Sequence, residues 1–183
     1  MSLYNCIVIF LRGVLKIFIG FKIAGSDNIP SDGAFLLCAN HHSNMDPVLI
    51  AAATPRQLTF MAKDELFHIP VLGAFIKKFG AFPIKRGKGE AAAVMATLKI
   101  LKKGGGTLIF PEGKRMKKGE RKQINPGIIR LSAQTGAPII PAFVGKRRVI
   151  YGEPLIYNLD TESDIQSIAD ELMETIYSLE NER

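Results

Sequence analysis

The stretch AFLLCANHHSNMDPVLI, residues 34–50, contains the change from strand to helix that decides the fold. Its first part is an apolar run of strand length, and Asp46 with Pro47 is typical of the start of a helix. Polar residues fill the turn between the two, and His41 comes near the end of the apolar run. The stretch therefore predicts a buried strand that ends in a polar loop and continues into a helix.

The rest of the chain repeats this alternation. Apolar runs bounded by Gly, Pro or charged residues predict further buried strands at 57–62, 79–84, 106–110 and 138–144. Helical periodicity follows at 47–53, 89–103, 124–135 and 162–180. A chain of 183 residues suits one domain, and strands that alternate with helices are typical of parallel sheets. We expect a single α/β domain with a mostly parallel central sheet flanked by helices.

Residues 1–21 form a separate apolar segment at the start of the chain. Within it, Asn5, Arg12 and Lys16 fall on one narrow stripe of a helix. Cations in its middle argue against a membrane-spanning helix, and their position differs from that in a secretory signal. We expect an amphipathic helix that lies in a membrane surface with its cations toward the headgroups, before a domain at 22–183. The alternative is a helix that packs on the domain's own core.

Composition restricts the class of partner. The net charge of +7 favours anionic partners such as acidic lipids or phosphorylated substrates. A nucleic-acid binder would explain this charge and the cluster KRMKKGERK at 114–122, but the sequence shows no helix–turn–helix, zinc-finger or RNP pattern. We therefore expect no nucleic-acid partner. Cys6 and Cys38 are isolated in apolar runs, which favours a reducing cytoplasmic setting over a disulfide framework or metal site.

The loop after the first predicted strand carries a candidate base. His41 stands at the carboxyl end of that strand, where open α/β sheets place ligands. Asp46 can turn back across the loop toward the imidazole, and a carboxylate that holds one ring nitrogen leaves the other as a base. The alternative is that Asp46 only caps its helix. His42 competes with His41 for the same role.

Two more predicted strands deliver polar residues to the same edge. LIFPEGKR, residues 108–115, runs from a buried strand into Glu112, Gly113 and Arg115. Glycine lets the backbone approach a ligand, and a guanidinium suits a phosphate. FGAFPIKRG similarly places Arg86 just after a strand.

Together these residues resemble the glycerolipid acyltransferases, and in particular the bacterial 1-acyl-sn-glycerol-3-phosphate acyltransferases. NHHSNMD at 40–46 matches the N-H-x-S-x-x-D block of that family. The segments that resemble its second, third and fourth blocks follow in the same order: GAFPIKR, FPEGKR and APIIPAFV. Lys114 stands where that family usually has Thr, and Asn125 where Lys often precedes Pro-Gly.

The resemblance implies transfer of a fatty acyl group from an acyl thioester, acyl-CoA or acyl-ACP, to the sn-2 hydroxyl of 1-acyl-sn-glycerol-3-phosphate (lysophosphatidic acid). The product would be phosphatidic acid, a precursor in phospholipid biosynthesis. An alcohol is hardly ionised at neutral pH, so a base must take its proton. His41 would be that base and Asp46 its orienter, while Asn40 and Ser43 support the loop. Because a thioester is already reactive, we expect direct transfer without an enzyme nucleophile. The resemblance implies no metal and no other cofactor.

The resemblance also implies a phosphate site and a location. Lys63, Arg86 and Arg115 would hold the phosphate, Gly113 would allow close approach, and Glu112 would fix Arg115 or the glycerol backbone. The protein would lie on the cytoplasmic face of the cell membrane, as a peripheral protein on anionic lipids. The alternatives are an acyltransferase for another lysophospholipid and a non-catalytic module that binds anionic lipid.

Overall fold

The computed structural model describes residues 3–84, 89–117, 120, 124–160 and 164–181. In this part of the chain, one sheet has the strand order β1-β7-β6-β2-β5-β3-β4. All its neighbouring strands are parallel except β6 and β7, which confirms the predicted mostly parallel α/β sheet. The strands are β1 (Lys22–Ala24), β2 (Phe35–Ala39), β3 (Leu58–Lys63), β4 (Ala81–Ile84), β5 (Gly106–Ile109), β6 (Ile139–Gly145) and β7 (Arg148–Tyr151).

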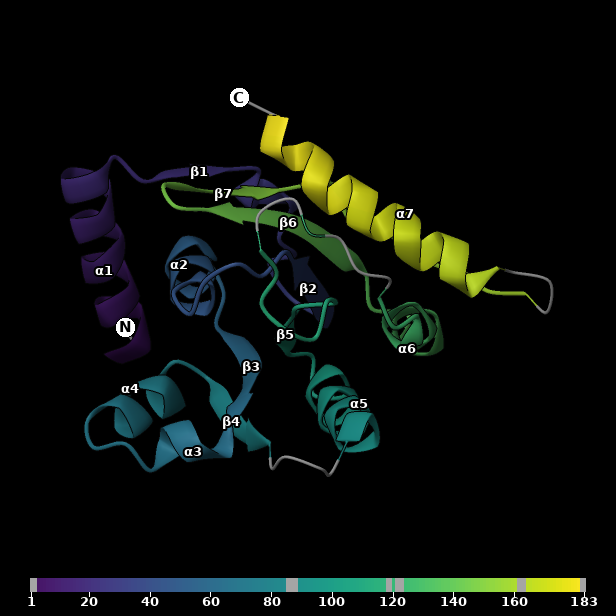
Figure 1. The fold of residues 1–183 in the computed structure, drawn as a ribbon, viewed down its shortest axis with the longest axis horizontal. Coiled ribbons are helices and arrows are strands. Elements are labelled where there is room, and N and C mark those ends of the chain that lie inside the picture. Colours follow the sequence, from purple (N-terminus) through teal and green to yellow (C-terminus); the bar gives the residue numbers. More distant parts are fainter. Residues whose placement is uncertain (1–2, 85–88, 118–119, 121–123, 161–163, 182–183) are drawn as a thin grey trace.

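Helices cover both faces of the sheet (Figure 1). One apolar cluster joins α1 and α2 to the sheet, and a second joins α5, α6 and α7 to the opposite face. Side chains of α3 and α4 pack against the first cluster. The helices are α1 (Leu3–Ile19), α2 (Asp46–Ala53), α3 (Asp64–Phe67), α4 (Leu72–Lys78), α5 (Gly89–Leu101), α6 (Gly127–Thr135) and α7 (Ile165–Ser178).

Strand β2 lies in the middle of the sheet and is buried along its whole length. Successive side chains of a strand point to opposite faces. Accordingly Phe35 and Leu37 belong to the cluster under α1 and α2, and Leu36 and Cys38 belong to the cluster under α5 to α7. A strand covered on both faces has a continuous apolar sequence, which is why FLLCA has no polar residue. The strand thus holds the following loop on a rigid support.

Helix α1 packs on the domain along one side. Val8 is buried, and Tyr4, Leu11 and Leu15 pack against the same apolar cluster as α2. Arg12 also turns inward: its Nε donates to the carbonyl oxygen of Ala52 over 2.8 Å, at the end of α2. The last carbonyls of a helix have no partner within the helix and attract a cation. The prediction that Arg12 points toward lipid headgroups is therefore wrong, because its side chain points into the protein.

The other side of α1 is exposed and apolar. Phe10, Ile17 and Phe18 are 73%, 80% and 79% exposed, and Lys16 is exposed beside them. The helix therefore packs on the core, as the second alternative predicts, and its outer side leaves a large apolar surface exposed. No helix in the described ranges combines the length and apolar character that a membrane crossing requires.

Candidate active site

The carboxyl ends of β2 and β5 lie side by side and bring two loops together. The two strands are parallel neighbours, with Cys38 opposite Ile109. His41 therefore follows β2 at the same edge of the sheet at which Phe110 follows β5. The two rings stack with centroids 4.0 Å apart and planes 17° apart. This contact fixes the plane of the imidazole at the edge of the sheet.

Asp46 holds His41 and closes the loop between them. Its Oδ2 lies 3.0 Å from His41 Nδ1 and accepts hydrogen bonds from the backbone N–H groups of His42 and Ser43, over 2.7 and 2.6 Å. Asp46 is the first residue of α2, and its side chain reaches back to the loop, so it is not the helix cap that the sequence predicts. With Nδ1–H donated to the carboxylate, Nε2 of His41 carries the lone pair that a base needs.

Asn40 and Ser43 both use their side chains to fix the same loop. Asn40 is fully buried, its Nδ2 donates to the carbonyl oxygen of Val144 over 3.0 Å, and its Oδ1 accepts from the Val144 N–H over 2.7 Å. This pair extends the contact between β2 and β6 by one residue. Ser43 Oγ accepts from the Met45 N–H over 3.1 Å, so its hydroxyl belongs to the turn.

His42 is tied to a different segment from His41. Its Nδ1 lies 3.1 Å from the carbonyl oxygen of Met116, and the Met116 N–H donates to the carbonyl oxygen of His41 over 2.8 Å. These two bonds join the histidine loop to the loop after β5. Because a ring nitrogen of His42 is used in this link, the geometry favours a structural role for His42.

Glu112 is a buried carboxylate beside the histidines. Its side chain is 2% exposed, and Oε1 accepts a hydrogen bond from the Tyr177 hydroxyl over 2.8 Å. Its Oε2 is also buried and has no hydrogen-bond partner among the described residues. Burial raises the pKa of Glu112 above its ordinary value, and the Tyr177 hydroxyl and the neighbouring His41 and His42 oppose that shift. The predicted partner, Arg115, does not contact Glu112 in the described part of the chain.

The predicted phosphate ligands are placed only in part. Lys63 ends β3 at the same edge of the sheet, and Arg115 follows Gly113 in the loop after β5. Both cations are exposed, and no partner is recorded for either within the described ranges. Gly113 has φ +69°, a left-handed conformation that favours glycine. Arg86 lies outside the described residues.

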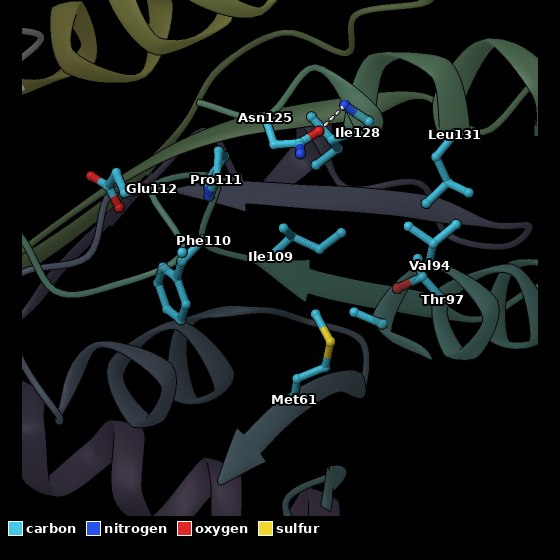
Figure 2. A pocket seen from close by; sticks show the side chains of 13 residues that line it. Met61, Val94, Thr97, Ile109, Phe110, Pro111, Glu112, Asn125, Ile128 and Leu131 are labelled. Atoms are coloured by element: carbon cyan, nitrogen blue, oxygen red, sulfur yellow. Dashed lines mark hydrogen bonds between the residues drawn. The ribbon is translucent and has the colours of Figure 1, made fainter. Parts of the chain in front are cut away.

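Two cavities flank the histidine loop. The smaller, of about 380 Å³, lies between α5, α6 and the sheet and is lined mainly by apolar side chains. Figure 2 shows Met61, Ile109 and Leu131 around it, with Glu112 toward the strand ends. The larger, of about 1270 Å³, is lined by His42 and Ser43 together with side chains of α1, β6 and α7: Leu15, Ile19, Phe143, Val144 and Tyr177. The larger cavity therefore reaches the histidine loop, and the smaller one reaches Phe110 and Glu112 in the loop after β5.

The described residues include no group of three or more His, Cys, Asp and Glu that could hold a metal ion. Tyr177 is not among the residues that the sequence singles out, because it belongs to none of the motifs considered there. Its only signal is a hydroxyl among the apolar positions of 162–180.

Comparison with known proteins places the chain among acyltransferases. The model of the Acyltransferase family matches residues 20–145. The chain is 29% identical to the 1-acyl-sn-glycerol-3-phosphate acyltransferase of Bacillus subtilis, over 93% of this chain and 94% of that protein. It is 34% identical to the enzyme of the same name from Streptococcus pneumoniae, over 91% of this chain and 67% of that protein.

A solved structure has the same fold. The crystal structure of the 1-acyl-sn-glycerophosphate (LPA) acyltransferase PlsC from Thermotoga maritima matches 100% of this chain and 85% of that chain, with a TM-score of 0.70 and 21% identity. The similarity extends over the whole sheet and its helices. It confirms the predicted fold class.

Proposed function

The chain belongs to the Acyltransferase family, and we propose that it transfers a fatty acyl group from an acyl thioester to the sn-2 hydroxyl of 1-acyl-sn-glycerol-3-phosphate, which yields phosphatidic acid. The observation that carries this proposal is the contact of 3.0 Å between His41 Nδ1 and Asp46 Oδ2 at the carboxyl edge of the sheet. The names of the relatives from Bacillus subtilis and Streptococcus pneumoniae support the choice of acceptor.

In the proposed reaction, His41 acts as general base. Its Nε2 takes the proton of the sn-2 hydroxyl while that oxygen attacks the thioester carbonyl, so that a C–O bond forms. The tetrahedral intermediate then collapses, the C–S bond breaks, and the imidazolium returns its proton to the leaving sulfur. Asp46 stabilises the imidazolium between these steps. Ser43 is not required as a nucleophile, and its hydroxyl is engaged in the turn to Met45.

The phosphate of the acceptor would be held by cations at the same edge. Lys63 and Arg115 are exposed, and the resemblance adds Arg86. A guanidinium and an ammonium form charge-assisted hydrogen bonds with phosphate oxygens. Glu112 Oε2 has no hydrogen-bond partner among the described residues and can accept a hydrogen bond in the substrate complex. The donor would be Arg115, once it binds the phosphate, or a hydroxyl of the glycerol backbone.

The acyl donor would be acyl-CoA or acyl-ACP. Coenzyme A carries phosphate groups, and an acyl carrier protein has an acidic surface, so a chain with a net charge of +7 attracts either. Because the donor already contains an activated carbonyl, the proposed reaction uses no other cofactor.

The protein would work as a peripheral membrane protein on the cytoplasmic face of the cell membrane. The exposed side of α1 presents Phe10, Ile17 and Phe18 to a bilayer, and Lys16 to anionic headgroups. The buried side of the same helix contributes Leu15 and Ile19 to the larger cavity, which reaches the histidine loop. A lipid acceptor could therefore pass from the bilayer to the site along one helix.

The test is a reaction of the purified protein with lysophosphatidic acid and each acyl thioester, with products resolved by mass spectrometry. We expect phosphatidic acid from the wild type and almost none from His41→Ala. If the protein acylates a different lysophospholipid and not lysophosphatidic acid, the proposed acceptor is wrong but the acyltransferase activity stands. Vesicle binding without turnover of any acceptor would identify a lipid-binding module and contradict the proposal.

A further inference from the structure

The C-terminal helix reaches into the candidate active site. The family match ends at residue 145, whereas α7 begins at Ile165. Nevertheless the hydroxyl of Tyr177, on α7, donates to Glu112 Oε1 over 2.8 Å. The helix therefore contributes a polar contact to the loop after β5 in addition to its apolar packing on the sheet.

The carboxylate that Tyr177 contacts has one oxygen without a partner. Glu112 is 2% exposed, and its Oε2 has no hydrogen-bond partner in the described part of the chain. A buried carboxylate oxygen without a donor costs free energy, so such an atom in a native site calls for a ligand or substrate donor. The hydroxyl of Tyr177 limits rotation of the carboxylate because it holds the other oxygen.

We propose that Tyr177 is a positioning residue of the acyl-transfer site, whose hydroxyl fixes Glu112 Oε1 and leaves Oε2 open to a donor in the substrate complex. The kinetic part of this inference rests on the proposed function. The expected donor is Arg115 as it binds the phosphate, or a hydroxyl of the glycerol backbone. Tyr177 itself need not touch the substrate.

The charges around Glu112 give the proposal a pH readout. The backbone N–H of His41 and the side chains of His41 and His42 face Glu112 from the loop after β2, and Tyr177 faces it from α7. Burial raises the pKa of Glu112, and the hydrogen bond from Tyr177 acts in the opposite direction. Removal of the hydroxyl should raise the pKa of Glu112 further, so that the carboxylate becomes protonated at a higher pH.

Tyr177→Phe is a suitable variant because it keeps the ring. That ring lies 6.5 Å from the His42 ring between centroids and lines the larger cavity. We expect kcat/KM for lysophosphatidic acid to fall roughly tenfold at the acid end of the profile, the usual effect of leaving a buried acceptor without its donor. The acid limb of the profile should move to higher pH, so that the loss is smaller in alkaline solution.

Tyr151→Phe is the matched control. Tyr151 is a buried tyrosine, whereas Tyr177 is half-buried, and the Tyr151 hydroxyl lies 2.9 Å from Thr54 Oγ1, on the other side of the sheet from Tyr177. Its replacement should lower the melting temperature and leave the shape of the pH profile unchanged. A loss of stability alone therefore does not reproduce the effect expected for Tyr177→Phe.

A second variant and a double mutant complete the test. Tyr177→His keeps a ring donor and should recover part of the acid-side activity. On a Glu112→Gln background, Tyr177→Phe should no longer move the acid limb, since no carboxylate remains. The inference is overturned if Tyr177→Phe has the wild-type profile, if Tyr177→His is no better than Tyr177→Phe, or if the limb moves equally on the Glu112→Gln background.

One measurement is independent of turnover. The carboxyl carbon of Glu112, assigned in the NMR spectrum by its loss in Glu112→Gln, can be titrated in wild type and in Tyr177→Phe. A higher midpoint in Tyr177→Phe supports the positioning role even if the wild type does not acylate lysophosphatidic acid. Equal midpoints contradict that role even if the proposed function is correct.

Discussion

Asp46 Oδ2 lies 3.0 Å from Nδ1 of His41 and also accepts the backbone N–H groups that close the loop between the two residues. One oxygen atom therefore both shapes the loop and orients the imidazole. Its structural task needs only an acceptor, whereas the stabilisation of an imidazolium needs a negative charge. An asparagine side chain provides a hydrogen-bond acceptor but no negative charge.

We therefore expect Asp46→Asn to lower kcat by roughly 10²–10⁴-fold, the range associated with a positioned acid–base group. The amide oxygen can still accept from the loop, so the melting temperature should change little. Steady-state rates with saturating lysophosphatidic acid and acyl thioester, together with thermal melts followed by circular dichroism, measure both quantities.

Asp64→Asn is the control. Asp64 Oδ2 lies 3.6 Å from His68 Nε2 on the surface of α3, so it is a second His–Asp pair with no place in the proposed site. Its kcat should equal that of the wild type. Normal turnover by Asp46→Asn would show that its carboxylate serves the loop alone.

The two adjacent histidines should differ sharply. His41→Ala removes the proposed base and should lower kcat roughly 10²–10⁴-fold. His42→Ala loses the bond to the carbonyl oxygen of Met116, which can bind water instead, and no group of the proposed acid–base pair, so its effect should be far smaller. Ser43→Ala should lie between them because the turn loses its hydrogen bond to Met45. An inactive His42→Ala beside a normal His41→Ala would assign the base to His42.

Much of the fold follows from apolar periodicity. The predicted strand 34–39 is β2, and 106–110 is β5, because both are apolar runs buried on two faces. The sequence does not predict β1 or β7. β1 is a three-residue edge strand, and β7 begins with Arg148. Short strands of this kind acquire their structure from pairing with a neighbour, which periodicity does not report.

The site is predictable where contacts are local and not where they are long-range. His41 and Asp46 lie within one turn between a strand and a helix, so their spacing sufficed. The partner of Glu112 lies 65 positions further along the chain, on α7, and Arg12 contacts carbonyls 40 to 42 positions away. Packing of whole helices decides such contacts. A sequence pattern shows the helix faces but not what they touch.

Replacement of Glu112 should separate stability from activity. Because burial raises the pKa of Glu112 in the folded state, protonation favours folding. That contribution is complete below the pKa of Glu112 in the unfolded chain and is lost as the pH rises through its pKa in the folded protein. Above its pKa in the folded protein, the ionised, buried carboxylate thus lowers stability. Glu112→Gln should melt higher than the wild type there, yet have a lower kcat/KM.

The measurement is the difference in melting temperature between Glu112→Gln and wild type across a series of pH values. This difference should increase as the pH rises and level off above the pKa of Glu112 in the folded protein. A difference that does not change with pH would mean that Glu112 keeps its ordinary pKa in the folded protein.

Arg115 should act on binding more than on chemistry. Its side chain is exposed with no recorded partner in the described ranges, so Arg115→Ala should leave the fold intact. Since a phosphate contact exists in both ground and transition states, KM for lysophosphatidic acid should rise roughly tenfold while kcat changes little. Lys63→Ala should raise KM less, because a lysine ammonium does not form the bidentate hydrogen bonds to phosphate that an arginine forms.

Arg130→Ala provides a comparison, since Arg130 is an exposed cation on α6. It should leave KM unchanged. An acceptor without a phosphate group should be acylated equally by Arg115→Ala and the wild type. Equal losses with both acceptors would assign Arg115 a structural role.

The two sides of α1 predict opposite phenotypes. On the inner side, Arg12 donates to the carbonyl oxygens of Ala52, Ala53 and Thr54. Arg12→Ala should lower the free energy of unfolding by about 1.5–3 kcal/mol, as expected for hydrogen bonds from a charged group, without weakening the binding of anionic vesicles. Deletion of the whole helix would instead remove the buried Val8 and expose the core beneath it, so point substitutions are the sharper test.

On the outer side, Ile17→Asp and Phe18→Asp should leave the melting temperature near that of the wild type, because both side chains are about four-fifths exposed (80% and 79%). Each change places a carboxylate where the proposal puts lipid, so co-sedimentation with anionic vesicles should weaken strongly. Lys16→Ala should lose ~1 kcal/mol of vesicle attraction, and added salt should reduce that difference. Acylation of lysophosphatidic acid in vesicles should fall in parallel, while acylation of the same acceptor dispersed in detergent should not. Vesicle binding that survives both aspartate substitutions would place the membrane contact elsewhere and leave α1 as a core helix.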